Sequence, residues 1–370
     1  MKKLGQLKIS LMKTGVYISE DLRQRPEVAR GFCRGMNAEK ITFALSDDFF
    51  VKTFLSANDT ACPRLKIHDD GIRLVFGKEE VNAIIVPLPE FIKKQQNDIT
   101  PASQNIELDG YCLNLFLRLM KKDKLNMATE TILSVIRAAF EEGAADLVQL
   151  NMDYCADVQQ GFQCMAPVIK EIKAQFRTFI SLRGFPPKEK GDIDKIYAAG
   201  VDLLNYPFEG FSNRTDKSFP AKRVMQGLEY AVEIFPQGAV STELVFEPGL
   251  DKSMNEKVDL LAQKGIIPFL RFPERMGGNM NDYAGIVDSL QHLAQSAQRH
   301  KLNLKWLFPA CHLVTPLDTA FFTDDSNSAR LTVRPVYQSK IGKRASEGFA
   351  ALRRKLRVRN ISDSFESSGL

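Results

Sequence analysis

From residue 108 to about residue 308, short apolar runs alternate with longer segments in which apolar residues recur every three or four positions. The first pattern is typical of buried β-strands and the second of amphipathic helices. The predicted strands are 108–115, 146–150, 177–182, 200–205, 239–246 and 266–271, with 303–308 as a seventh candidate. The predicted helices lie at 132–139, 165–172, 193–199, 224–235, 258–262 and 283–293. Six or seven β-α units in succession predict a parallel sheet, because parallel neighbours need crossover connections.

Three phrases in this stretch resemble one another. Each has the end of a helix, a glycine and then a buried strand: Glu142–Val148, Ala198–Leu204 and Ala262–Pro268. Glycine commonly ends helices in this way. The recurrence favours a TIM-type (β/α) barrel, partial or complete, over an open nucleotide-binding sheet. No Gly-x-Gly-x-x-Gly follows the first strand, and the sequence has no P-loop. The predicted fold class is therefore α/β, with the barrel at 106–318.

The segments on either side of the predicted barrel have other patterns. Residues 1–105 indicate a small β-rich N-terminal module, with a strand at 40–45, a hairpin at 64–76 around an Asp-Gly turn, and a third strand near 81–87. Residues 319–370 are predicted to form a C-terminal extension with a basic helix near 345–357 and a disordered end.

Composition places the chain among ordinary globular proteins. Of its 370 residues, 44% are hydrophobic and 26% are charged. No apolar run approaches the roughly 18 residues of a membrane span, and Met1–Gln6 is not followed by the apolar core of a secretory signal. The six scattered cysteines do not form a disulfide framework. We therefore expect a cytoplasmic protein without a membrane span.

Positive charge is concentrated in the C-terminal extension. Residues 340–359 contain eight Lys or Arg and one acid, Glu347, whereas the whole chain has a net charge of +5. One interpretation is a helix docked on the barrel with a solvated basic face. The other is contact with nucleic acid, an acidic partner or a membrane surface. The segment contains no recognised RNA-binding motif, so the nucleic-acid interpretation rests on charge alone.

Candidate chemistry lies at the predicted strand ends, because active sites of (β/α) barrels are built at the carboxyl ends of the strands. The residues there are Cys112–Leu119, then Asn151, Asp153 and Cys155, then Arg183, then Asn205 and Glu209, then Glu243 and Glu247, then Arg271 and Arg275, and finally Cys311 and His312. Arginine binds carboxylate or phosphate through two parallel hydrogen bonds. Arg183, Asn205 and Glu243 are therefore the predicted substrate-binding residues.

The stretch Gly110–Met120 resembles the cofactor loop of the radical S-adenosylmethionine superfamily, in its biotin-synthase-like branch. In that family the first barrel strand leads into Cys-x3-Cys-x2-Cys, whose thiolates hold a 4Fe-4S cluster. With Cys112 as the first cysteine, Phe116 and Leu119 take the other two places. Neither side chain can bind iron. The resemblance thus implies a degenerate member that lacks the standard cluster.

Weaker parts of the resemblance lie on the later strands. Asn151–Asp153, Tyr206–Glu209, Gly238–Thr242 and Pro268–Arg271 are similar to family segments that contact S-adenosylmethionine, although Thr242 stands where a glycine is expected. The cofactor-binding residues that the resemblance implies are Cys112, Asp153, Glu209, Thr242 and Arg271.

Three hypotheses about function remain open. In the first, a degenerate homologue still binds S-adenosylmethionine or a related small molecule, and acts as a non-radical enzyme or as the partner of a cysteine-complete homologous enzyme. In the second, a metal or cluster site is rebuilt from Cys112, Cys155, Cys311 and His312. In the third, an unrelated barrel enzyme uses Asp153, Glu209, Arg183 and Arg271 for acid–base chemistry and anion binding. A purely structural role is the remaining alternative.

Overall fold

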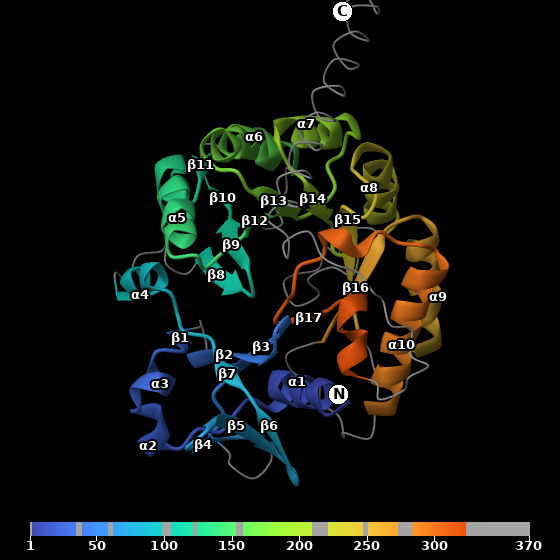
Figure 1. The fold of residues 1–370 in the computed structure, drawn as a ribbon. Helices are drawn as coiled ribbons and strands as arrows, with labels where there is room; N and C mark the ends of the chain where they lie inside the picture. The colour runs from blue at the N-terminus through green and yellow to red at the C-terminus, as the bar shows by residue number, and fades with distance from the viewer. Residues whose placement is uncertain are drawn as a thin grey trace, which may run out of the picture.

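The computed structural model describes residues 2–34, 39–57, 62–97, 105–120, 124–152, 158–208, 221–246, 251–272 and 283–322. Its largest feature is an eight-stranded sheet with the order β17-β16-β15-β14-β13-β12-β9-β8. The sheet is curled, and helices surround its outer side in an arc (Figure 1). The chain is thus an α/β protein built on a curled, partly barrel-like sheet.

The six inner strands of this sheet are parallel, and the two edge strands are antiparallel to their neighbours. The inner strands are β9 (Cys112–Leu117), β12 (Leu147–Met152), β13 (Phe179–Arg183), β14 (Leu203–Asn205), β15 (Val240–Val245) and β16 (Ile267–Arg271). The edge strands are β8 (Ile106–Asp109) and β17 (Leu313–Val314). The parallel sheet expected from the apolar runs is confirmed.

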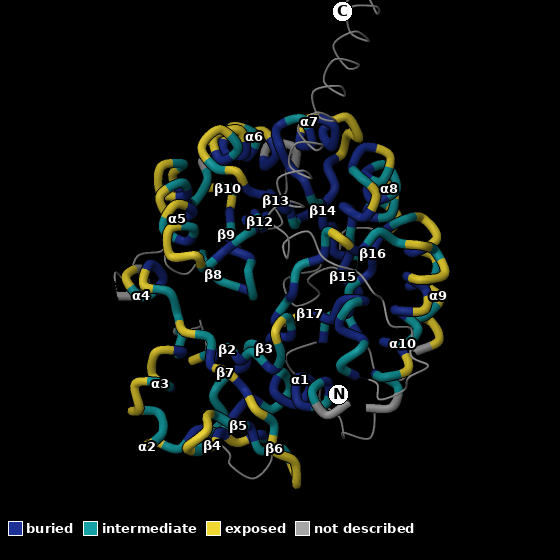
Figure 2. Tube along the Cα trace, viewed as in Figure 1, coloured by how far each residue is buried: buried dark blue, intermediate teal, exposed yellow. Residues whose placement is uncertain are grey.

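Six amphipathic helices cover the outer face of the sheet. They are α5 (Thr129–Glu141), α6 (Val158–Gln175), α7 (Gly191–Ala199), α8 (Ala221–Ile234), α9 (Asp251–Gln263) and α10 (Tyr283–Arg299). Each follows the 3.6-residue repeat of the sequence; in α5, for example, Ile132, Val135 and Ile136 are buried. Full burial of such a side chain stabilises the fold by roughly 1.5–3 kcal/mol. Figure 2 shows these helices buried toward the sheet and exposed on the outside.

The predicted first strand, 108–115, is wrong, because two strands occupy this region. β8 and β9 form a hairpin in which Asp109 pairs with Cys112. Gly110 turns the chain with a φ of 59°, which glycine adopts without strain. Cys112 pairs with Leu147, the first residue of β12, so it begins its strand. The prediction that Cys112 lies at the carboxyl end of the first strand is therefore wrong.

The predicted seventh strand, 303–308, is also wrong. This segment contains the short 3₁₀ helix η3 (Leu304–Trp306), and the Asn303 side chain accepts a hydrogen bond from the backbone nitrogen of Lys305. This local side-chain bond favours a helical turn over an extended chain. The strand that borders β16 is β17, and it runs antiparallel to β16.

Residues before β8 form two antiparallel sheets and four helices in the described part of the chain. The first sheet contains β1 (Phe32–Arg34), β2 (Glu39–Ser46), β3 (Phe49–Phe54) and β7 (Ile84–Ile85), and the second contains β4 (Arg64–His68), β5 (Gly71–Phe76) and β6 (Glu79–Asn82). The helices are α1 (Lys2–Thr14), α2 (Glu20–Arg23), α3 (Pro26–Ala29) and α4 (Glu90–Asn97). The predicted hairpin is confirmed, since β4 and β5 pair from Arg64↔Val75 to His68↔Gly71.

Three short elements complete the described structure: β10 (Leu119–Met120), β11 (Lys124–Leu125) and the 3₁₀ helix η4 (Pro316–Phe321). The boundary predicted at residue 318 falls inside η4, where Thr319 donates a hydrogen bond to the Leu290 carbonyl on α10. The predicted basic helix and disordered end lie outside the described residues. Among the described helices, none combines the length and apolarity that a membrane crossing requires.

Candidate functional site

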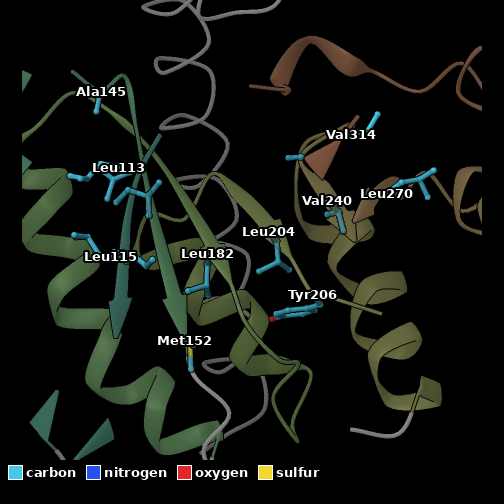
Figure 3. Close-up of a cluster of buried hydrophobic side chains, with 14 of the residues drawn as sticks. Leu113, Leu115, Ala145, Met152, Leu182, Leu204, Tyr206, Val240, Leu270 and Val314 are labelled. Atoms are coloured by element: carbon cyan, nitrogen blue, oxygen red, sulfur yellow. The ribbon is translucent and has the colours of Figure 1, made fainter. Parts of the chain in front are cut away.

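The two faces of the curled sheet carry different side chains. Successive residues of a strand point to opposite faces. One set, which includes Leu113, Leu115, Leu182 and Leu204, packs toward the helices as part of the main apolar core (Figure 3). The alternate set points to the inner face of the curl. Parallel strands covered on both faces are normally apolar throughout, so polar residues on this inner face indicate a site.

The amino end of the inner face is apolar. Cys112, Leu147 and Phe179 start three neighbouring strands and form a buried cluster, against which Trp306 of η3 packs. The rings of Phe179 and Trp306 meet edge to face, with centroids 5.4 Å apart. The buried Cys112 thiol belongs to this apolar end. Burial raises the pKa of Cys112 well above its ordinary value, so the thiol stays protonated at neutral pH.

One step further along the strands, the inner face holds a network of amides. The Gln149 amide donates to Asn114 Oδ1 (2.8 Å) and to Asn151 Oδ1 (3.0 Å). Asn151 also donates to Asn114 Oδ1 at 3.0 Å, and Ser181 donates to Gln149 Oε1 at 3.2 Å. Three strands, β9, β12 and β13, thus present connected polar groups, which lowers the cost of burying them.

The carboxyl end of the inner face holds paired charges. Glu243 on β15 is only 1% exposed. The Arg183 guanidinium on β13 reaches it with two hydrogen bonds, from Nε at 2.5 Å and from Nη2 at 2.8 Å. Arg271 on β16 lies on its other side, with Nε 3.7 Å from Glu243 Oε2. Burial favours protonation of Glu243, but the two guanidinium groups, Arg183 first, hold its pKa below the ordinary value.

Asn205 lies on β14, between the strands that carry Arg183 and Glu243. It pairs in register with Arg183 on one side and Ser241 on the other. Its side chain is 5% exposed, and its Oδ1 has no hydrogen-bond partner among the described residues. A buried amide oxygen without a partner is uncommon in proteins. Asn205 therefore offers an acceptor on the inner face.

His312 and Asp109 form a second ionic pair near these groups. The ring Nδ1 of His312 lies 2.7 Å from Asp109 Oδ2, and the backbone nitrogen of Cys311 donates to Asp109 Oδ1 at 2.5 Å. Asp109 is buried, whereas the His312 side chain is 53% exposed. Leu313, the next residue, pairs with Arg271 across the β17–β16 ladder. His312 is thus held beside the strand that carries Arg271.

The electrostatics of this pair favour two opposite charges. Burial opposes ionisation of Asp109, but protonated His312 keeps the pKa of Asp109 far below its ordinary value. Crowding around the ring disfavours protonated His312, yet the attraction of Asp109 raises its pKa above the ordinary 6.5, and Glu107 and Glu243 act in the same direction. Because Leu313 pairs with Arg271 and Glu243 favours the charged form of His312, the two ionic groups form one candidate site.

The predicted site residues are therefore divided by the structure. Arg183, Asn205, Glu243, Arg271 and His312 come together. Thr242 faces the other way: it is fully buried and donates to the Tyr206 carbonyl at 2.7 Å, so the structure does not place it where a cofactor on the inner face would lie. Asp153, Cys155, Glu209, Glu247 and Arg275 lie outside the described residues.

The metal hypothesis places Cys112, Cys155, Cys311 and His312 together. Cys112 lies at the apolar amino end, and Cys311 is a buried thiol whose pKa is raised by burial and by Asp109. Within the described residues, no group of three His, Cys, Asp or Glu side chains has the arrangement of a metal site.

The sequence placed Asn114 and Asn151 at strand ends, but it did not reveal Asp109, Gln149 or the network that joins the amides. Asp109 was placed inside a strand, although the dipeptide Asp109-Gly110 is a turn signal that predicts the hairpin. Asn114 and Gln149 stand among apolar neighbours, where polar residues at alternate positions indicate one polar face.

Comparisons with known proteins identify no family. No protein-family model matches the chain, and no curated protein matches it. Among solved structures, Yersinia pestis DHPS with a pterine-sulfa conjugate has 12% identity and a TM-score of 0.30. The match covers 65% of this chain and 92% of the DHPS chain. A mutant tryptophan synthase alpha-subunit from Pyrococcus furiosus has 13% identity and a TM-score of 0.31, and the match covers 67% of this chain and 97% of that subunit. At such TM-scores these likenesses carry no argument about this chain.

Proposed function

We propose that this chain is a barrel-type enzyme that binds a small acidic molecule at the carboxyl end of its curled sheet and uses His312 as a general acid–base. The observation that carries the proposal is the inner face itself. Arg183, Asn205, Glu243 and Arg271 come from four successive strands and meet beside His312. Active sites of barrel enzymes are built at this end of the strands.

His312 has the geometry of an acid–base group. Its Nδ1 is bonded to the Asp109 carboxylate, so the ring orientation is fixed and Nε2 is left for proton exchange. The ring is half exposed, which allows contact with a ligand. The attraction of Asp109 raises its pKa above the ordinary 6.5, so the imidazolium that would donate a proton is favoured.

The two arginines favour an acidic ligand. A guanidinium binds carboxylate or phosphate through directed N–H groups, and Glu243 holds both Arg183 and Arg271 in place. The Asn205 amide adds a neutral acceptor for a hydroxyl or amine of the ligand. A carboxylic acid or phosphate ester matches the charge and the hydrogen-bonding groups of this set.

The relation to radical S-adenosylmethionine proteins stays a prediction. Cys112, the one cysteine of the degenerate motif, lies at the amino end of β9, opposite the charged groups. Asp153 and Glu209, the other expected contacts, are outside the described residues. S-adenosylmethionine itself carries a carboxylate, so it belongs among the ligands to be tested, as does the predicted partnership with a cysteine-complete homologue.

The chain has only four histidines, so each imidazole can be followed separately by NMR. The signal of His312 is identified by its loss in His312→Gln. We expect orthophosphate, malonate or S-adenosylmethionine to shift this signal saturably, and Arg271→Gln to weaken the effect by tenfold or more. Arg137→Gln, which removes an exposed arginine on α5, serves as the matched control. If none of the three probes moves the His312 signal, the proposed acidic-ligand site is wrong.

A further inference from the structure

Lys8 on α1 is a fully buried lysine whose charge lies next to the segment that carries His312. Its side chain is 0% exposed. The ammonium nitrogen donates to the carbonyl oxygens of Ala310 (2.9 Å) and Leu313 (3.2 Å). It also lies 4.6 Å from the ring centroid of Phe49 on β3, a cation–π contact. A buried ammonium is tolerated only where its donors are used, and here they are used on one short segment.

The two carbonyls that Lys8 holds stand on either side of Cys311 and His312. Both intervening residues contact Asp109, one through its backbone nitrogen and the other through its ring. The hairpin packs against the same segment, since a Cβ on Gly110 would lie 2.8 Å from the Pro309 carbonyl oxygen. The segment 309–313 is therefore held between α1 and the β8–β9 turn (Figure 1).

We propose that Lys8 is a positioning residue for His312: by binding the Ala310 and Leu313 carbonyls, α1 fixes this segment so that the imidazole remains hydrogen-bonded to Asp109. The N-terminal helix is then part of the working site, although it precedes the sheet by about a hundred residues. The biological meaning of this inference rests on the function proposed for His312, but its measurement needs no ligand.

The charged groups around His312 make the inference testable, because a purely electrostatic role and a positioning role of Lys8 predict opposite changes in the pKa of His312. Asp109 and Glu107 face it from β8 and Glu243 from β15, while Arg271 lies on β16. Lys52 on β3 binds Glu107 at 2.6 Å, and Asp318 on η4 interacts with Lys8. If Lys8 acted only through its charge, its removal would raise the pKa of His312, because one positive charge would be lost. If Lys8 positions the segment, its removal weakens the His312–Asp109 bond and lowers that pKa.

The experiment is an NMR titration of the four histidines in the full-length Lys8→Met variant without ligand. We expect the pKa of His312 to fall toward its ordinary value of 6.5 and the other three histidines to titrate as before. The matched control is Lys173→Met. Lys173 also donates to a backbone carbonyl, that of Thr178 (2.6 Å), and to Asp202 (2.6 Å), but on another part of the sheet. His312 should titrate normally in this control.

Three results would overturn the inference: an unchanged His312 pKa in Lys8→Met, a raised one, or an equal fall in Lys173→Met. Should Lys8→Met not fold, Phe49→Leu provides the decision, because it removes the ring beside the ammonium, which also stacks on Phe321 of η4, and leaves Lys8 in place. We expect a smaller fall of the His312 pKa in Phe49→Leu, and no fall would refute the positioning role. Failure of every acidic probe to bind would leave this measurement intact, so the two proposals fail separately.

Discussion

The two ends of the inner face differ sharply although the same strands build them. On β13, Phe179 at the amino end is fully buried against Trp306, while Arg183, four residues later, forms a two-point ion pair with Glu243. Both residues point to the same face, because they are an even number of positions apart. One end is stabilised by packing and the other by paired charges.

The contrast between the two ends indicates that the carboxyl end of the inner face has a binding or catalytic role. Paired buried charges often contribute less stability than apolar side chains of the same volume would. The apolar amino end shows that this fold can fill its inner face with packed side chains. Charges at the carboxyl end are therefore not required by the architecture, and their presence there favours a role in binding or catalysis.

The largest expected effect is at the apolar end. Phe179→Ala removes a fully buried ring and leaves a cavity beside Trp306, so we expect the free energy of unfolding to fall by about 3–5 kcal/mol. Urea denaturation measures this loss. The His312 NMR titration should be unchanged under conditions where the variant is folded. A loss below about 1 kcal/mol would show that this end is loosely packed.

At the charged end, Glu243→Gln should lower the free energy of unfolding by less than Phe179→Ala does. The amide leaves two guanidinium groups without their buried carboxylate, but both remain partly solvated, with 13% and 25% exposed side chains. We expect a loss of about 2 kcal/mol in urea denaturation. The control is Glu229→Gln, which breaks the exposed pair with Lys264 and should cost about 0.5 kcal/mol. Equal losses in the two variants would contradict the importance of the buried pair.

The sequence predicted the repeating architecture well, because the apolar pattern of each strand or helix lies within its own short segment. Every inner strand from β12 to β16 and every helix from α5 to α10 overlaps a predicted element. The edges were predicted poorly. A turn at Gly110 divides one apolar run into two strands, and η3 occupies another run, since apolarity alone does not distinguish a buried strand from a buried turn.

Only part of the candidate site was predicted, because the local pattern locates residues on strands but does not indicate contacts between distant segments. Arg183, Asn205 and Arg271 are the last residues of their strands, and Glu243 lies two residues before the end of β15, so their level in the sheet can be derived from the strand pattern. Asp109 and Lys8 could not be assigned in the same way. Their contacts with residues 310–313 join positions 202 to 305 residues apart, and the pattern along the chain contains no signal for such pairs. Cys112 was misplaced because its assignment depended on the undivided first strand.

The buried thiols provide a third prediction with a smaller effect. Cys112 and Cys311 are buried and their pKa values are raised, so iodoacetamide should not modify them in the native protein at pH 8. Cys33, Cys62 and Cys164 are partly exposed and should react first. Mass spectrometry of the labelled peptides measures both rates. Rapid native labelling of Cys112 would contradict its place in the apolar cluster and reopen its role as a ligand.

The smallest expected effect is the pH dependence that the His312–Asp109 pair adds to stability. The pKa of His312 is raised on folding, so its contribution is complete below its unfolded value of about 6.5 and is lost as pH rises through the folded pKa. The pKa of Asp109 is lowered on folding, so its contribution is present above its unfolded value of 3.8 and is lost as pH falls through the folded pKa.

The difference in unfolding free energy between the wild type and His312→Gln should therefore be greatest between about pH 5 and pH 6 and decline as pH rises above neutrality. Urea denaturation at a series of pH values tests this, with His300→Gln as a control in the turn that follows α10. Because the His312 ring is half exposed, solvent screens the pair and the variation should be small. A difference in unfolding free energy that does not vary with pH would mean that Asp109 does not raise the pKa of His312. The acid–base role at the charged end of the sheet would then lose its physical basis, while the apolar end would be unaffected.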